Sequence, residues 1–272
     1  MKGIAFGQFY PTDSLLHRLD PRAKLIMALL YVITSFLCKN VLGFAAMLAL
    51  AFLLILISRI PVGTVLRSIR PVLFIMLFTA VLHVFMTAGD TLLFEWRFIH
   101  VYREGLYHAA FMMVRIFVLI VGMSMFMTYT TTPIMLTDAI EQLLAPLKKI
   151  KVPVHEFAMM MTIALRFIPT LMEETEKIMA AQKARGVDFS TGSLLSRARA
   201  LIPILVPLVV SAFRRADELA TAMECRCYHG GDGRTRMTQL RYKGRDYASL
   251  CAMLLFCAAC VICNYLGIGY SM

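Results

Sequence analysis

Long runs of uncharged, apolar residues are the feature that most constrains what this chain can fold into. A helix needs about 20 consecutive apolar residues to cross the hydrocarbon core of a bilayer. Five such runs are present: Leu25–Cys38, Val41–Ile57, Pro71–Gly89, Ala109–Thr128 and Tyr247–Met272. The first two are short and are separated only by Lys39 and Asn40, which predicts a helical hairpin. The expected fold is therefore an all-α, polytopic membrane protein with about five transmembrane helices.

The composition excludes the other broad classes of protein. Hydrophobic residues make up 59% of the 272 residues and charged residues only 17%, whereas a soluble domain is about half apolar and a quarter charged. A soluble enzyme, a disordered chain and a disulfide scaffold are therefore excluded. Few residues lie outside the apolar runs, so the net charge of +11 does not indicate nucleic-acid binding. Four of the seven cysteines lie in the last run and are expected to pack as small apolar side chains rather than to bind metal.

The positions of lysine and arginine predict the orientation in the membrane. If the N-terminus is inside, segments 1–24, 58–70 and 129–246 lie inside and carry 24 Lys and Arg residues, against three in the outside segments. Cytoplasmic loops of membrane proteins carry an excess of these residues. The sequence therefore predicts a multi-pass protein of the plasma membrane with its N-terminus in the cytoplasm.

Between the fourth and fifth predicted spans the character of the chain changes. Residues 129–246 hold 17 of the 28 basic and 12 of the 17 acidic residues. Their apolar segments, Phe157–Leu165 and Ala200–Phe213, are too short for a span and are expected to form amphipathic helices at the cytoplasmic face. The expected organisation is N-terminal transmembrane helices in 1–128, a cytoplasmic-face region in 129–246, and a C-terminal transmembrane helix in 247–272.

The cytoplasmic-face region contains an internal repeat. Thr170–Gly186 aligns with Ser211–Cys227 at an offset of 41 residues, and a proline precedes each unit. Each unit ends in an arginine between two small residues: Ala184, Arg185 and Gly186 in the first, and Cys225, Arg226 and Cys227 in the second. One such arginine could simply complement the dipole at the end of a helix. Two at matching positions favour docking into acidic pockets of a partner with two similar sites, because the planar guanidinium pairs well with carboxylates.

Catalytic motifs are missing from the sequence. The dipeptide Gly-Lys does not occur, so no Walker A loop exists, and His155-Glu156 lacks the second histidine of a zinc-protease motif. His83 and Arg115 are isolated ionisable residues within predicted spans. We therefore expect no catalytic residue, cofactor or metal site. A stand-alone permease with its own substrate path, a membrane-embedded enzyme and a static assembly scaffold are the alternatives to a coupling role.

Four segments together resemble one family. Residues 7–10, 13–14 and 16–22 resemble the opening of the transmembrane T subunits (EcfT) of energy-coupling factor (ECF) transporters. Residues 181–186 and 222–228 resemble that family's two Ala-Arg-Gly motifs, and residues 230–236 resemble a loop of members that serve many substrates. The second motif departs from the family pattern, because Cys225 and Cys227 flank its arginine.

This resemblance implies a coupling subunit of a vitamin importer of the ATP-binding-cassette (ABC) type in a bacterial cell membrane. Two cytoplasmic ABC-type ATPases would dock on its coupling helices through the two arginine motifs. An interchangeable small membrane protein, the S component, would bind the substrate. The chain itself would not be an enzyme, because the ATPase activity would reside in its partners. It would transmit the opening and closing of the ATPases to the S component.

Overall fold

The computed structural model describes residues 9–87, 91–96, 99–187, 189, 193–230 and 239–266, with side chains for all of these except 92–96, 99–101, 194 and 196–198. The chain divides into two compact units. The membrane unit comprises residues 1–139 and 239–272, and the coupling unit comprises residues 140–238. In the sequence, the coupling unit therefore interrupts the membrane unit between residues 139 and 239.

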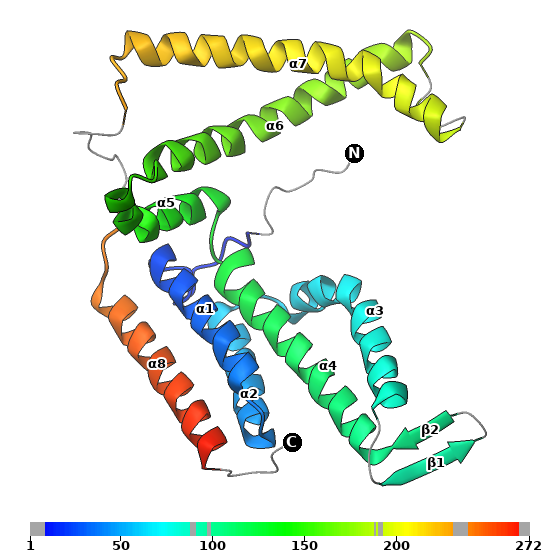
Figure 1. Cartoon of the computed structure of the whole chain (residues 1–272). Coiled ribbons are helices and arrows are strands. Elements are labelled where there is room, and N and C mark those ends of the chain that lie inside the picture. Colours follow the sequence, from blue (N-terminus) through cyan, green and yellow to red (C-terminus); the bar gives the residue numbers. More distant parts are fainter. Residues whose placement is uncertain are drawn as a thin grey trace. The chain divides into compact units, whose positions relative to one another are not determined.

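Helices dominate both units (Figure 1). The membrane unit contains α1 (Pro21–Leu37), α2 (Val41–Ser58), α3 (Val62–Met86), α4 (Arg103–Met123), the π-helical turn η1 (Ser124–Thr128) and α8 (Gly244–Tyr265). The boundary between the units falls within α5 (Pro133–Leu144), and the coupling unit continues with η2 (Ala145–Ile150), α6 (Val154–Ala184) and α7 (Leu194–Cys225). The strands β1 (Leu92–Trp96) and β2 (Ile99–Tyr102) form an antiparallel pair before α4, which the sequence analysis did not predict.

The expectation of an all-α, polytopic membrane protein is confirmed. Within the described residues four helices are long and apolar enough to cross a membrane: α2, α3, α4 with η1, and α8. The first predicted span corresponds to α1, which has 17 residues and is about 25 Å long at 1.5 Å per residue. The hydrocarbon core is about 30 Å thick, so a fifth span remains a prediction.

Close packing between α1 and α4 holds the centre of the membrane unit. The Tyr31 side chain of α1 is fully buried, and its hydroxyl donates a 3.0 Å hydrogen bond to the Val118 carbonyl of α4. One turn further along α4, Gly122 leaves room for this ring, because a Cβ there would stand 2.1 Å from Cε1 of Tyr31. The absence of a side chain at Gly122 therefore sets how closely the two helices approach.

We expect Gly122→Ala to lower the free energy of unfolding by about 1–3 kcal/mol, because the added methyl group overpacks a filled core. The matched control is Gly63→Ala in the first turn of α3, where a Cβ meets no atom within 4 Å. There the higher helix propensity of alanine gives a neutral or slightly stabilising effect. Thermal unfolding of both variants in detergent measures the difference, and equal midpoints would contradict this packing.

Two polar side chains in the membrane unit pair with carbonyls at helix ends. Arg115 of α4 donates from Nη2 to the carbonyl of Cys38, at the C-terminus of α1, over 3.1 Å. Asn40 donates from Nδ2 to the carbonyl of Cys263 near the end of α8, also over 3.1 Å. The last carbonyls of a helix lack partners within the helix, and a bilayer provides no water to replace them. Arg115 therefore faces the helix bundle and serves its packing.

Candidate functional site

The repeat identified in the sequence forms two long helices, α6 and α7. They contain 31 and 32 residues. The sequence predicted that the apolar segments Phe157–Leu165 and Ala200–Phe213 are separate from the charged units that follow them. In the structure each apolar segment and its charged unit lie in one continuous helix. The helices continue through Pro169 in α6 and through Pro203 and Pro207 in α7.

Polar contacts show that α6 and α7 run antiparallel. Glu174 of α6 accepts hydrogen bonds of 2.6 Å from the Ser211 hydroxyl and from Nη2 of Arg215. Eight residues later in α6, Gln182 contacts Pro203, which lies earlier in α7. Residues later in α6 therefore contact residues earlier in α7, as in an antiparallel pair. The two helices cross each other (Figure 1).

One of these contacts repairs a break in α7. Proline has no backbone N–H, so Pro207 leaves the carbonyl of Pro203, four residues earlier, without its helical partner. The Gln182 side chain donates to this carbonyl from Nε2 over 3.4 Å. Gln182 lies in the segment of the first arginine motif, so this hydrogen bond connects the end of α6 to α7 at the point where Pro207 interrupts its hydrogen bonding.

The other contact is an ion pair sensitive to acid. The Ser211 hydroxyl and, after it, the Arg215 guanidinium lower the pKa of the Glu174 carboxyl from its ordinary value. Hydrogen bonds to the charged form produce such a shift. The pair therefore stabilises the helix contact fully above the ordinary glutamate pKa, and this contribution is lost as the pH falls through the lowered value.

The first arginine motif closes α6 with a Schellman motif. Arg185 is the C-cap residue, and Gly186 adopts the left-handed conformation with φ of +88°. The Gly186 N–H donates to the Lys183 carbonyl over 3.0 Å, and the Val187 N–H donates to the Gln182 carbonyl over 3.1 Å. These two bonds are the defining pair of the Schellman motif.

The second arginine motif closes α7 in the same way. The Cys227 N–H donates to the Glu224 carbonyl over 2.8 Å, and the Tyr228 N–H donates to the Met223 carbonyl over 3.0 Å. Every donor and acceptor is 41 residues beyond its counterpart in the first motif. Cys227 takes the place of Gly186 and adopts a φ of +55°. The departure from glycine at this position therefore leaves the helix ending unchanged.

The two arginines project from opposite ends of the helix pair. Arg185 lies 11 residues beyond Glu174, and Arg226 lies 15 residues beyond Ser211, in antiparallel helices. At 1.5 Å per residue the two motifs stand roughly 30–40 Å apart. Both arginines and their flanking residues are exposed: Ala184, Gly186, Cys225 and Cys227. Within the described part of the chain neither guanidinium has a hydrogen bond or an ion pair.

The matched helix ends predict opposite effects of two substitutions. Cys227→Gly should raise the free energy of unfolding of α7's end by about 1 kcal/mol, because glycine adopts the left-handed region without the Cβ penalty. Gly186→Ala should lower the free energy of unfolding of the end of α6 by a similar amount. This loss comes from the backbone conformation, because no neighbouring atom lies within 4 Å of the added methyl group. Hydrogen exchange at the two helix ends measures both effects, and changes of the same sign would contradict the matched motifs.

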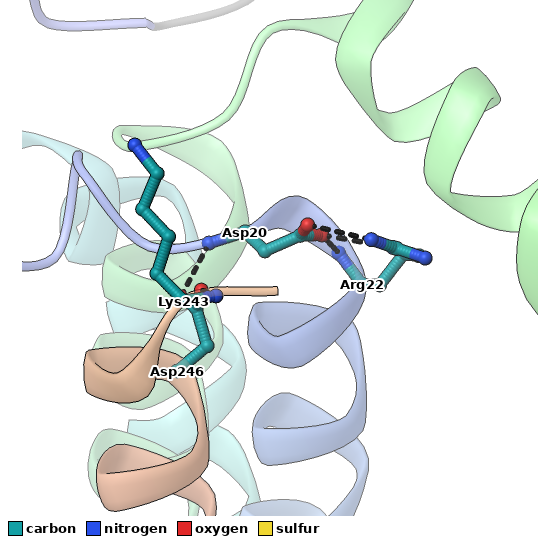
Figure 2. Close-up of polar contacts among 4 residues, drawn as sticks. All are labelled: Asp20, Arg22, Lys243 and Asp246. Atoms are coloured by element: carbon teal, nitrogen blue, oxygen red, sulfur yellow. Dashed lines mark hydrogen bonds and ion pairs between the residues drawn. The ribbon is translucent and has the colours of Figure 1, made fainter. Parts of the chain in front are cut away.

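A second cluster, which sequence reasoning missed, lies where α1 and α8 begin (Figure 2). Asp246 is almost completely buried, and its carboxylate accepts hydrogen bonds from the N–H of Asp20 over 2.8 Å and of Lys243 over 2.7 Å. Asp20 in turn caps α1 and pairs with Arg22 at 2.8 Å. Asp246 therefore joins the first turns of two helices that are 226 residues apart in sequence.

A buried lysine extends this cluster to the end of η1. Lys24 is 1% exposed, and its Nζ donates to the carbonyl of Thr130 over 2.8 Å. The chain leaves the membrane unit soon after Thr130 and returns shortly before Lys243. We call Asp20, Arg22, Lys24 and Asp246 the junction cluster, because it fixes both connections on the membrane-unit side. The sequence signal was the Asp-Pro pair at 20–21, a typical helix start, but nothing in it indicated Asp246 as the partner.

Parts of the resemblance lie outside the described residues. These parts are Gly7 and Gln8 of the N-terminal run and residues 231–236 of the loop after the second motif. The remaining motif residues are all described. The structure places Ala184, Arg185 and Gly186 at the end of α6 and Cys225, Arg226 and Cys227 at the end of α7.

Comparison with known proteins identifies the family of this chain. The family CbiQ, described as cobalt transport protein, matches residues 12–237. A protein of Clostridium kluyveri named energy-coupling factor transporter transmembrane protein EcfT is 53% identical over 94% of this chain and 96% of its own length. The protein of the same name from Bacillus subtilis is 46% identical over 95% of this chain and 97% of its own. The chain therefore belongs to the CbiQ/EcfT family, the transmembrane T subunits of energy-coupling factor transporters.

Proposed function

We propose that this chain couples two cytoplasmic ABC-type ATPases to a substrate-binding S component in a vitamin importer of the bacterial cell membrane. Arg185 and Arg226 each insert into an acidic groove on one ATPase. The approach of the two ATPases on binding ATP then moves the ends of α6 and α7, and this motion reaches the S component. The chain itself carries no ATPase activity in this scheme.

The observation that carries the proposal is the pair of matched arginine motifs. Two exposed guanidinium groups end two antiparallel helices with the same hydrogen-bond pattern. Their separation of roughly 30–40 Å suits two separate domains better than one binding site. An Arg fork recognises a carboxylate through two parallel hydrogen bonds, so acidic grooves are the expected complement. A helix cap alone does not require, at both ends, an arginine whose side chain has no partner among the residues that the structure describes.

The apolar halves of α6 and α7, one on each side of the crossing, are the proposed contact surfaces for the S component. Phe157, Met160 and Met161 of α6 are 41–58% exposed, and Leu205 and Val206 of α7 are both 57% exposed. Exposed apolar surface of this extent marks an interaction site with a protein or a membrane. Methionine side chains adapt to different shapes, which suits an interchangeable partner. The crossing at Glu174 would transmit motion from the arginine ends to these two surfaces.

The junction cluster is the proposed anchor of this motion. It holds Thr130 and Lys243, where the chain leaves and re-enters the membrane unit. Because these connections are fixed, displacement of α6 and α7 would act on the S component and would not be absorbed by movement of the segments that link the two units. The distribution of Lys and Arg favours a cytoplasmic location for this cluster and for the arginine motifs, where ATPases and ATP are available.

Arg115 bears on the alternative of a stand-alone permease. Such a protein needs polar side chains along a path between its spans. Arg115 is the charged residue within the predicted span Ala109–Thr128, and its guanidinium is bonded to the Cys38 carbonyl and lies 5.1 Å from the Phe44 ring. It is used in holding helices together, which favours the coupling function.

Native cysteines provide the test. Cys225 and Cys227 flank Arg226 and are exposed, so a maleimide reagent should label them in the isolated chain. In the complex purified with its ATPases we expect both to be protected. The matched control is Lys149→Cys, an exposed position in η2, which should remain labelled in both states. Equal labelling of Cys225 and Cys227 with and without ATPases would overturn docking at this motif.

A further inference from the structure

An apolar cavity lies between the helices of the membrane unit. It has a volume of about 350 Å³ and is lined by side chains of α1, α2, η1 and α8. Representative lining residues are Met27, Leu50, Leu54, Phe126, Met253 and Phe256. The one charged residue of the lining is Arg245, in the first turn of α8. The volume falls in the range of about 300–1,000 Å³ that is typical of small-molecule sites.

A polar pocket adjoins this cavity on the side where α2 ends. Leu15 and Ile57 line both spaces, so the two are neighbours. The polar pocket adds Arg18, which precedes α1, and Arg59, which follows α2. Asp13 is its one acidic residue and lies 3.8 Å from Arg18. Three arginines against one aspartate give this end a net positive charge.

The three arginines lie at the same end of the bundle. Asp246 joins the first turn of α8 to the residue before α1, and the 3.4 Å bond from the Thr12 hydroxyl to the Ser58 carbonyl ties the segment before α1 to the end of α2. Arg18, Arg59 and Arg245 are all exposed. From this end the lining runs along α8 from Arg245 to Phe256, which is about 16 Å at 1.5 Å per residue.

We propose that this site binds one anionic phospholipid, with an acyl chain in the apolar cavity and the phosphate at Arg245, Arg18 and Arg59. The almost wholly apolar lining suits a hydrocarbon chain. The guanidinium groups suit a phosphate, and basic pockets between transmembrane helices on the cytoplasmic side bind anionic lipid head groups. In the orientation proposed above, the lipid comes from the cytoplasmic leaflet. The inference does not depend on ATPase docking.

The experiment counts lipids retained by the full chain. The protein is purified in detergent, exchanged into micelles containing equal amounts of phosphatidylglycerol and phosphatidylcholine, and examined by native mass spectrometry. We expect one phosphatidylglycerol to be retained in preference to phosphatidylcholine. Arg18→Gln combined with Arg245→Gln should reduce its retention by at least tenfold, since each basic residue near an anionic lipid contributes about 1 kcal/mol. Arg103→Gln at the other end of the bundle is the charge control.

A second pair of variants tests the cavity by filling it. Ala252 lines the cavity on α8, whereas Ala258 lies about 120° around the same helix, outside the cavity lining. Both alanines are exposed. Ala252→Phe should abolish retention, and Ala258→Phe should leave it unchanged. Equal retention of the two lipids, equal retention by both phenylalanine variants, or a protein segment crosslinked at position 252 in the assembled complex would overturn the proposal.

Discussion

Replacing Arg185 and Arg226 together by alanine is expected to reduce ATP-driven substrate uptake at least 30-fold. Loss of one partner from a desolvated arginine contact costs roughly 2–5 kcal/mol, and the double variant loses one contact at each end of the helix pair. Each single variant should retain one docked end and show a smaller loss. Uptake in cells that depend on the transporter measures the effect.

The controls separate docking from charge and from folding. Arg214→Ala removes another exposed arginine of α7 that lies away from the motif and should leave uptake unchanged. Arg185→Lys with Arg226→Lys keeps the charge but loses the planar fork, so it should show an intermediate loss. Both arginines are exposed caps, and their backbone bonds do not use the side chain, so the variants should remain folded. Normal uptake by the double alanine variant would contradict docking through these residues.

Asp246→Ala is expected to lower the free energy of unfolding by about 3–5 kcal/mol. The substitution leaves the N–H groups of Asp20 and Lys243 without their acceptor in a buried site, and it leaves Asp20 as the remaining one of the two carboxylates that offset the charge of the buried Lys24. Removing one partner from a buried charged network has a cost of this size. Thermal unfolding of the purified protein in detergent measures it.

A graded series distinguishes this cluster from ordinary core packing. Asp246→Asn keeps one acceptor oxygen and should lose about 1–3 kcal/mol. Asp217→Ala removes an exposed carboxylate from α7 and should change stability by less than about 0.5 kcal/mol. If the alanine variant at position 246 unfolded at the wild-type temperature, Asp246 would not hold α1 to α8.

The sequence predicted the membrane helices well because each span obeys a local rule. Hydrophobicity over about 20 residues is enough to locate α2, α3, α4 and α8. The length of α6 and α7 was underestimated for an equally physical reason. Apolar and charged segments alternate along them, and Pro169 and Pro207 suggested boundaries. Proline within a helix is tolerated when another group replaces the lost bond, and Gln182 does so at Pro203. That contact is between helices and leaves no local signal.

For the arginine motifs, more of the site than of the helix endings could be predicted from the sequence. The 41-residue repeat gave the positions of the two motifs, the small residues beside each arginine and the equivalence of the two units. The sequence did not show that cysteine could take the glycine position, because a positive φ at Cys227 is maintained by the hydrogen bonds of the whole helix end. Asp246 was not anticipated either. Its partners are backbone N–H groups, which carry no residue signature, and one of them lies 226 residues away.

The most direct test of the central claim is to isolate this chain from its own membrane and count the proteins that remain bound. We expect two ABC-type ATPase subunits and one small membrane protein for each copy of the chain. Arg185→Ala and Arg226→Ala should each weaken retention of one ATPase, and the double variant should lose both. Recovery of the wild-type chain alone, with a small solute bound between its spans, would contradict the account and establish a stand-alone permease.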